Sequence, residues 1–99
     1  MVKKLPWMTR VDLHLIEFLS DHDIVFTPRM MFINLERELS ELDAPSYSQI
    51  KRRILFLTDA NILEQYRDER GHYLLTDLGT RLIREDLRED DKEHLAALE

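Results

Sequence analysis

The stretch that decides the fold is Ser46-Tyr-Ser-Gln-Ile-Lys-Arg-Arg-Ile-Leu-Phe-Leu-Thr-Asp-Ala-Asn-Ile-Leu63. Its apolar residues Ile50, Ile54 and Leu57 fall on one side of a helix that turns by about 100° per residue. Ser46 is a preferred N-cap residue, because its hydroxyl can accept a hydrogen bond from a free backbone N–H of the first turn. The stretch therefore predicts a helix over residues 46–60 that buries one side.

Three consecutive cations, Lys51-Arg52-Arg53, lie inside that helix, although the whole chain has a formal net charge of −6. On the helical projection Arg52 points away from the buried side together with Ser48. Lys51 and Gln49 flank this outer face, and Arg53 lies nearer the edge of the core. Cations gathered on one helix of an acidic chain indicate that the helix has a polyanion as its partner.

Downstream of this helix, two strand-like segments, 62–66 and 72–76, are joined by the polar turn Arg67-Asp-Glu-Arg-Gly71. The glycine and the short length of the turn are typical of a β-hairpin. Thr76 is then expected to cap a last helix, whose apolar stripe consists of Leu78, Leu82, Ile83 and Leu87.

Two further helices are predicted upstream. Thr9-Arg-Val-Asp12 fits a capping box, which opens a helix that runs to about Asp21. Thr27-Pro28 opens a second helix, which we expect to continue to about Leu42, before Asp43-Ala-Pro45 ends it. The apolar segment 24–26 between them can form a short strand beside the hairpin.

The predicted elements follow the order helix, helix, recognition helix, two-stranded wing and C-terminal helix. This is the element order of a winged helix-turn-helix. The predicted fold class is therefore mostly α with a small β-hairpin. A chain of 99 residues forms one domain. We expect a winged-helix DNA-binding domain over 1–88 and an acidic C-terminal helical extension over 89–99.

Composition limits the function classes. The chain has no cysteine, no apolar run long enough to span a membrane, and no apolar stretch behind its N-terminal lysines that would make a signal peptide. We therefore expect a soluble, cytoplasmic protein. Residues 85–99 carry a net charge of −5, so the rest of the chain is nearly neutral. Twenty acids, ten arginines and four lysines are typical of a salt-adapted surface.

Four segments resemble archaeal winged-helix transcription regulators, in particular the small haloarchaeal proteins similar to the phage phi-H repressor. The matching segments lie within residues 7–87, and they are Trp7-Met-Thr9 with Asp12 and Leu15–Leu19, Tyr47–Ile54, Leu57–Leu63, and Tyr73-Leu-Leu-Thr-Asp-Leu-Gly79. The resemblance implies that Tyr47–Ile54 belongs to a recognition helix that enters DNA. The chain departs from the family in its longer and more acidic segment 36–43, and in Asn61, where the family commonly has glycine.

The candidate DNA-binding residues follow from these patterns and are Tyr47, Ser48, Gln49, Lys51, Arg52, Arg53, Arg67 and Arg70. Arg52 is the candidate for reading a base, Lys51 for binding phosphate, and Arg53 for either phosphate contact or bracing the core. Alternatively, the basic run is a solvated face that pairs with Glu36, Glu38 or Glu41. Tyr47 can equally well cap and pack, and the acids between Arg67 and Arg70 weaken a wing contact.

Other residues are expected to be structural. The four histidines lack ligand spacing, so no metal and no cofactor are expected. Met30, Met31 and Phe32 are expected to pack in the core, with a small-molecule pocket as the alternative. Leu55 and Phe56 are expected to pack beneath the wing or against the first helix, with a partner contact as the alternative. Because the chain has no phosphate loop, nucleophile–base pair or HExxH pattern, we expect no enzyme.

The expected function is a sequence-specific DNA-binding transcriptional regulator, a repressor, that binds double-stranded DNA as a homodimer. The alternative is a winged-helix protein-interaction module in a transcription or defence complex. Leu95, Ala96 and Leu98 follow the charged stretch 89–93, and a monomer has no evident need for them. We therefore expect the dimer contact to involve the C-terminal helix, with a frayed terminus as the alternative.

Overall fold

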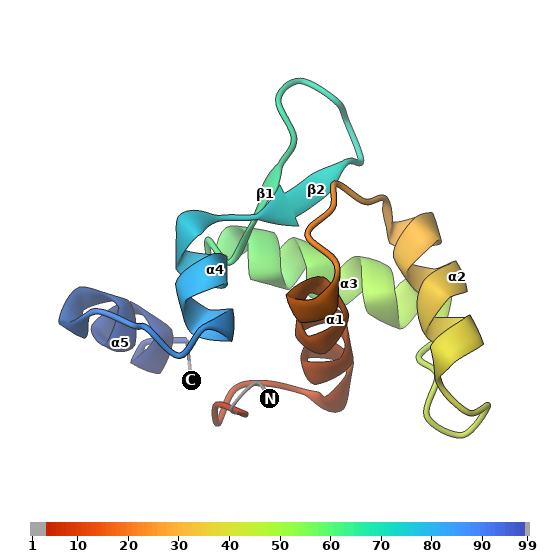
Figure 1. The fold of residues 1–99 in the computed structure, drawn as a ribbon, viewed down its shortest axis with the longest axis horizontal. Helices are drawn as coiled ribbons and strands as arrows, with labels where there is room; N and C mark the ends of the chain where they lie inside the picture. The colour runs from red at the N-terminus through yellow and green to blue at the C-terminus, as the bar shows by residue number, and fades with distance from the viewer. Residues whose placement is uncertain (1–3, 99) are drawn as a thin grey trace.

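The computed structural model describes residues 4–98. In chain order the elements are α1 (Arg10–Asp21), α2 (Pro28–Glu38), α3 (Tyr47–Asp59), β1 (Leu63–Gln65), β2 (Tyr73–Leu75), α4 (Asp77–Ile83) and α5 (Glu89–Ala96). Helix α3 crosses behind α1, with α2 and α4 on opposite sides and the hairpin above them (Figure 1). The predicted class, mostly α with a small β-hairpin, is confirmed, and this arrangement is compatible with a winged helix.

The predicted helix starts are confirmed, because each depends on a side chain acting within its own first turn. Thr9 accepts from Asp12 N at 3.2 Å, and Ser46 accepts from Gln49 N at 3.2 Å. Both form complete capping boxes. Thr27 and Thr76 cap α2 and α4 in the same way. Each such cap contributes on the order of 1 kcal/mol.

Helix α2 ends at Glu38, so the prediction that it continues to about Leu42 is wrong. Leu39 adopts an extended conformation. Ser40 then organises a separate turn: its carbonyl accepts from the backbone N–H groups of Asp43 and Ala44, and its hydroxyl donates to the Asp43 carboxylate at 3.1 Å. Serine and aspartate compete in this way with helical hydrogen bonding. Leu42 is consequently 95% exposed in the connection to α3.

The last helix is also interrupted, so Leu87 does not belong to the stripe predicted for it. Glu85 has a φ of 56° in the left-handed region, and Asp86 N donates to Arg81 O at 2.9 Å. This is the usual geometry of a helix C-terminus. Leu87 lies in the linker that follows, half-buried against the core, and α5 begins at Glu89.

The two strands form an antiparallel pair in which Leu63 faces Leu75 and Gln65 faces Tyr73. The strand expected at 24–26 is reduced to one residue: Phe26 exchanges two backbone hydrogen bonds with Tyr73, at 2.9 and 2.8 Å. This bridge joins the α1–α2 connection to the hairpin. At the start of the hairpin, Asn61 has a φ of 65°, the left-handed conformation that asparagine tolerates.

All these elements contribute to one core, and α5 contributes to it as well. The buried residues include Leu15, Leu35, Ile54, Ile62 and Leu82, with Leu95 of α5 only 3% exposed. The segment after the charged stretch thus has a role within its own chain. The expectation that its leucines require a partner is therefore wrong for Leu95, whereas Ala96 is exposed.

Candidate nucleic-acid interface

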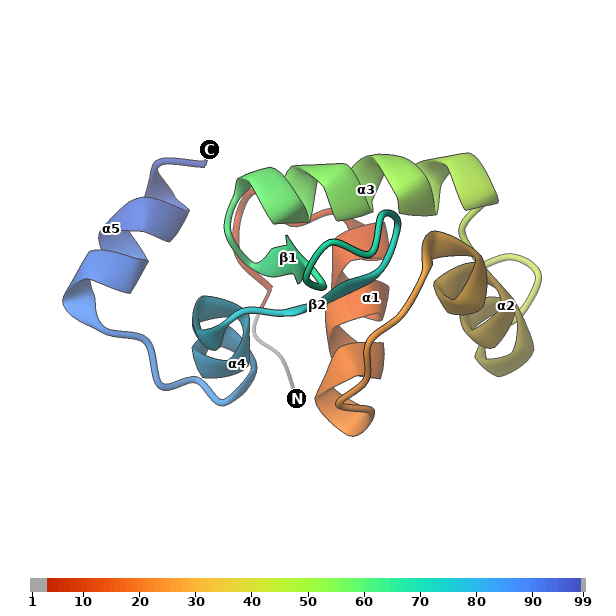
Figure 2. The same ribbon diagram turned by 90° about the horizontal axis from the view of Figure 1, so that it is seen from above.

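Helix α3 has one buried and one open side, as the sequence predicts. Ile50, Ile54 and Leu57 are at most 1% exposed, whereas the outer positions Ser48, Gln49, Lys51 and Arg52 are all exposed. From above, α3 runs along one side of the molecule, with α1 on its inner side (Figure 2). The outer face of α3, defined by those four exposed residues, is thus a polar and basic surface.

Tyr47 connects this face to α2. Its ring meets the ring of Phe32 edge-on, with centroids 5.7 Å apart, so it has the packing role considered for it. Two cations also lie near this ring: the Lys51 Nζ is 4.7 Å and the Arg29 Cζ 5.2 Å from its centroid. Lys51 comes from α3 and Arg29 from the start of α2. We call these three side chains the Tyr47 cluster.

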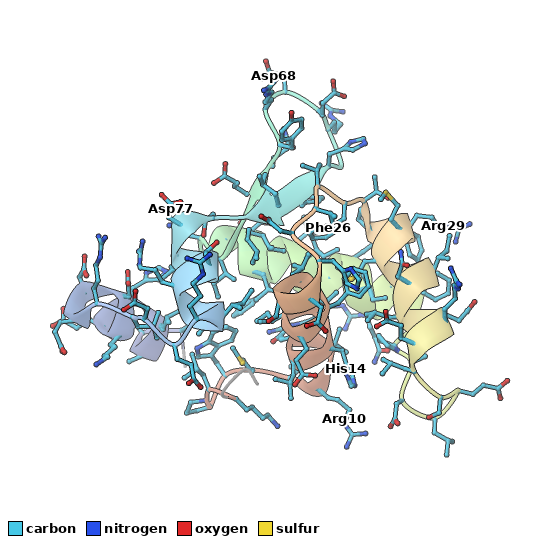
Figure 3. All side chains as sticks on the ribbon, viewed as in Figure 1. Arg10, His14, Phe26, Arg29, Asp68 and Asp77 are labelled. Carbon is cyan, nitrogen blue, oxygen red and sulfur yellow. The ribbon has the colours of Figure 1, made fainter. Side chains whose placement is uncertain are left out.

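Arg29 is a functional candidate that sequence reasoning missed. It is exposed, and Figure 3 shows it on the outer side of α2. The available signal was its position directly after Pro28, in the first turn of a helix that precedes the basic helix. Only the packing of α2 against α3 places Arg29 beside Tyr47.

Lys51 and Arg52 on this face, and Arg29 beside it, form no ion pair with another described residue. Among residues 4–98 the ion pairs are Arg10–Asp43, His22–Glu38, Arg53–Asp12, Arg81–Asp91 and Lys92–Glu89. Within that described part, Lys51, Arg52 and Arg29 have no carboxylate within 4.0 Å. The alternative in which the basic run pairs with Glu36, Glu38 or Glu41 is therefore absent from this structure.

Arg53 differs from its two basic neighbours. Its guanidinium donates two hydrogen bonds of 2.7 Å to Asp12 of α1 and lies 4.1 Å from the ring centroid of Phe56. Its side chain is only 21% exposed. Arg53 thus occupies the bracing position, one of the two roles expected for it. Phe56 packs as expected, whereas Leu55 is 58% exposed, so the expected packing of Leu55 is wrong. The expected packing is likewise wrong for Met30, which is 42% exposed, although Met31 is buried.

The hairpin loop carries both signs of charge. Arg67 and Arg70 are exposed, and so are Asp68 and Glu69 between them. Figure 3 shows Asp68 at the tip of the loop. The Arg67 guanidinium lies 5.0 Å from the ring centroid of Tyr66, and Arg67 has a φ of 50°. Arg67 and Arg70 can therefore both contact an anion from the loop, but the carboxylates of Asp68 and Glu69 between them would repel it.

The acidic helix α5 lies beside the C-terminal end of α3, opposite the end that carries Tyr47 (Figure 2). His94 of α5 donates from Nε2 to the carbonyl oxygen of Ala60, at the C-cap of α3, with a distance of 2.7 Å. Arg81 forms two hydrogen bonds to Asp91, at 2.7 and 2.9 Å. These bonds, together with one from the backbone N–H of Arg88, lower the pKa of Asp91 to about 2. The views place α5 beside the C-terminal end of α3 and α2 beside its N-terminal end (Figure 2).

Other kinds of site are not found in the part of the chain that the structure describes. No group of three or more His, Asp or Glu side chains there could hold a metal ion. Within the same residues, no helix is both long and apolar enough to cross a membrane. Comparison with protein-family models, curated proteins and solved structures finds no match to this chain.

Proposed function

We propose that this chain is a winged helix-turn-helix DNA-binding protein that regulates transcription as a repressor. The observation that carries the proposal is the Tyr47 cluster. Two cations from different helices lie near one aromatic ring, and neither has a carboxylate within 4.0 Å among the described residues. Exposed cations without an ion-pair partner are available to bind an anion. A DNA phosphate at this point supplies that anion and places the outer face of α3 against the duplex.

The outer residues of α3 then take separate roles. Arg52, exposed in the second turn, reads a base edge, where a two-bond contact to guanine is worth about 1–3 kcal/mol of discrimination. Ser48 and Gln49 lie in the first turn, the part of a recognition helix that reaches furthest into the major groove. Lys51 binds phosphate. Arg67 and Arg70 of the hairpin make further backbone contacts, which set orientation rather than sequence preference.

The distribution of charge supports this orientation. The acidic helix α5 lies at the C-terminal end of α3, away from the Tyr47 cluster. A duplex that approached the α5 end would meet exposed carboxylates and be repelled. We therefore propose that DNA lies over the N-terminal half of α3 and the hairpin.

A homodimer completes the proposal. Two recognition helices related by a two-fold axis read half-sites about 34 Å apart, and the operator is then palindromic. The contact is proposed to involve α5 through residues outside the core, such as the exposed Ala96. Leu95 is excluded from it, because that side chain is buried in its own domain.

The proposal is tested by selecting bound sequences from a pool of random duplexes. Enrichment of one palindromic sequence, bound with an affinity that falls as salt increases, is the expected result. Equal recovery of all sequences at every salt concentration would contradict it.

A protein-interaction module is the second candidate. It is favoured by exposed apolar side chains close to the basic face: Met30 and Ile33 of α2, 42% and 46% exposed, and Leu55 of α3, 58% exposed. Such side chains are often found in protein contacts. The same selection separates the two candidates, because a protein-interaction module enriches no DNA sequence.

A further inference from the structure

Asp12 is the one carboxylate of the described core that faces α3. It is 0% exposed. Its Oδ1 accepts from Arg53 Nε at 2.7 Å, and its Oδ2 accepts from Arg53 Nη2 at 2.7 Å and from Thr9 N at 3.0 Å. The first turn of α1 is thereby joined to the middle of α3, across 41 positions of sequence.

Arg53 lies beside two other cations on α3. Burial of Ile50, Ile54 and Leu57 sets which side of the helix faces inward, and so places Arg53 rather than Lys51 or Arg52 near α1. Apolar contacts hold smaller rotations and shifts of the helix less firmly, because the hydrophobic effect has no direction. A bidentate bond between a guanidinium and a carboxylate does have direction, since its two parallel N–H groups fit only one arrangement.

We propose that Asp12 is a positioning residue, which holds Arg53 and so fixes the fine rotational setting of α3, and with it the exact position of Arg52 on the outer face. A rotated helix would leave the buried Asp12 without its partner, and an unpaired buried charge is strongly unfavourable. Arg53 therefore acts on DNA through the placement of Arg52 and does not itself contact DNA. The inference rests on the proposed function, in which Arg52 reads a base.

Through aromatic contacts, Arg53 is also connected to Trp7 in the N-terminal segment. The guanidinium lies against Phe56, whose ring centroid is 5.7 Å from that of Trp7. Trp7 is the only tryptophan of the chain. A change in the setting of α3 should therefore alter Trp7 fluorescence and the nuclear magnetic resonance signals of the Phe56 ring, with or without DNA.

The experiment compares Arg53→Lys and Asp12→Asn with the wild type on a selected operator and on an unrelated duplex. Lysine keeps the charge but loses the paired bonds, and asparagine retains an oxygen that can accept from Thr9 N. Arg37→Lys is the matched control, because Arg37 is exposed on α2 and forms no ion pair among the described residues.

The expected result for Arg53→Lys and Asp12→Asn is a roughly 5- to 150-fold loss of operator affinity, the range for one lost base contact. Affinity for the unrelated duplex and the salt slope should be unchanged. Equal weakening of both duplexes by Arg53→Lys would instead make Arg53 a contact to the DNA backbone and overturn the inference. Unchanged operator affinity in folded variants would reduce the pair to a structural role and also overturn it.

A readout without DNA distinguishes this inference from the proposed function itself. If the wild type prefers no sequence, the proposed function fails. The effect of the Asp12–Arg53 pair on the placement of α3 can still be tested by the amide resonances of α3. Asp12→Asn and Arg53→Lys should both shift those resonances and change Trp7 fluorescence, whereas Arg37→Lys should change neither. Resonances like those of the wild type in both variants would refute the positioning role.

Discussion

Replacing Gly79 with alanine should destabilise the fold, although glycine-to-alanine changes inside helices usually stabilise. Gly79 is buried in the first turn of α4, directly after the hairpin. An alanine Cβ at this position would lie 2.3 Å from the carbonyl oxygen of Ile62 and 2.8 Å from Leu75 Cδ2. The Leu75 side chain can move, whereas the Ile62 carbonyl is held by hydrogen bonds from the backbone and hydroxyl of Thr76.

The magnitude follows from two opposing effects. Alanine gains about 0.8–1 kcal/mol of helix propensity over glycine, and inserting a methyl group into packed structure costs about 1–3 kcal/mol. A contact of 2.3 Å with fixed backbone places the cost at the upper end of that range. The net loss of about 1–2 kcal/mol should lower Tm by roughly 4–16 °C for a domain of this size.

Thermal unfolding followed by far-ultraviolet circular dichroism measures this change. Thr80→Ala is the matched control, because Thr80 is the next residue of α4 and is only half-buried. Its Tm should remain within a few degrees of the wild type. A Gly79→Ala variant that melts at or above the wild-type temperature would show that α4 does not approach Ile62 as described.

Three further predictions concern Asp91, Arg29 and the proposed contact through α5. The pKa of Asp91 is lowered from 3.8 to about 2, so its ionised pair with Arg81 is fully present above pH 4 and is lost as the pH falls toward 2. The difference in Tm between the wild type and Asp91→Asn should therefore shrink as the pH falls from 4 to 2. A difference independent of pH would contradict this. Arg29→Ala should reduce the slope of log affinity against log salt by about 0.9, and Arg37→Ala should leave it unchanged. Equal slopes in both variants would remove Arg29 from the interface. Ala96→Arg, which leaves the buried Leu95 in place, should convert a wild-type dimer to monomers in analytical ultracentrifugation. A wild-type monomer, or an undiminished dimer in the variant, would exclude an α5 interface through Ala96.

The features that could be predicted from the sequence are those set by neighbouring residues. The helix starts at Thr9, Ser46 and Thr76 follow from hydrogen bonds that span three positions. The inward side of α3 follows from its apolar spacing. These local signals also predicted the exposure of Arg52 correctly, because the direction of a side chain on a helix depends on its position relative to the apolar stripe.

The remaining features depend on groups distant in sequence. The periodic leucines of 35–42 gave no sign that Ser40 would form its own turn and end α2 early. Leu95 resembled an unpartnered leucine until the fold of α5 placed it in the core. Arg53 and Arg29 each have a partner on another helix, Asp12 and Tyr47, and spacing along one helix does not reveal either contact.

The most direct test of DNA reading by α3 is the affinity of Arg52→Ala for a selected operator and for operators changed one base pair at a time. The variant should bind the operator about 1–3 kcal/mol more weakly and should lose its preference at one position of each half-site. Lys51→Ala serves as the comparison, since it should weaken all sequences about equally. An Arg52→Ala variant that retains both the affinity and the full sequence preference of the wild type would contradict the assignment of α3 as the recognition helix.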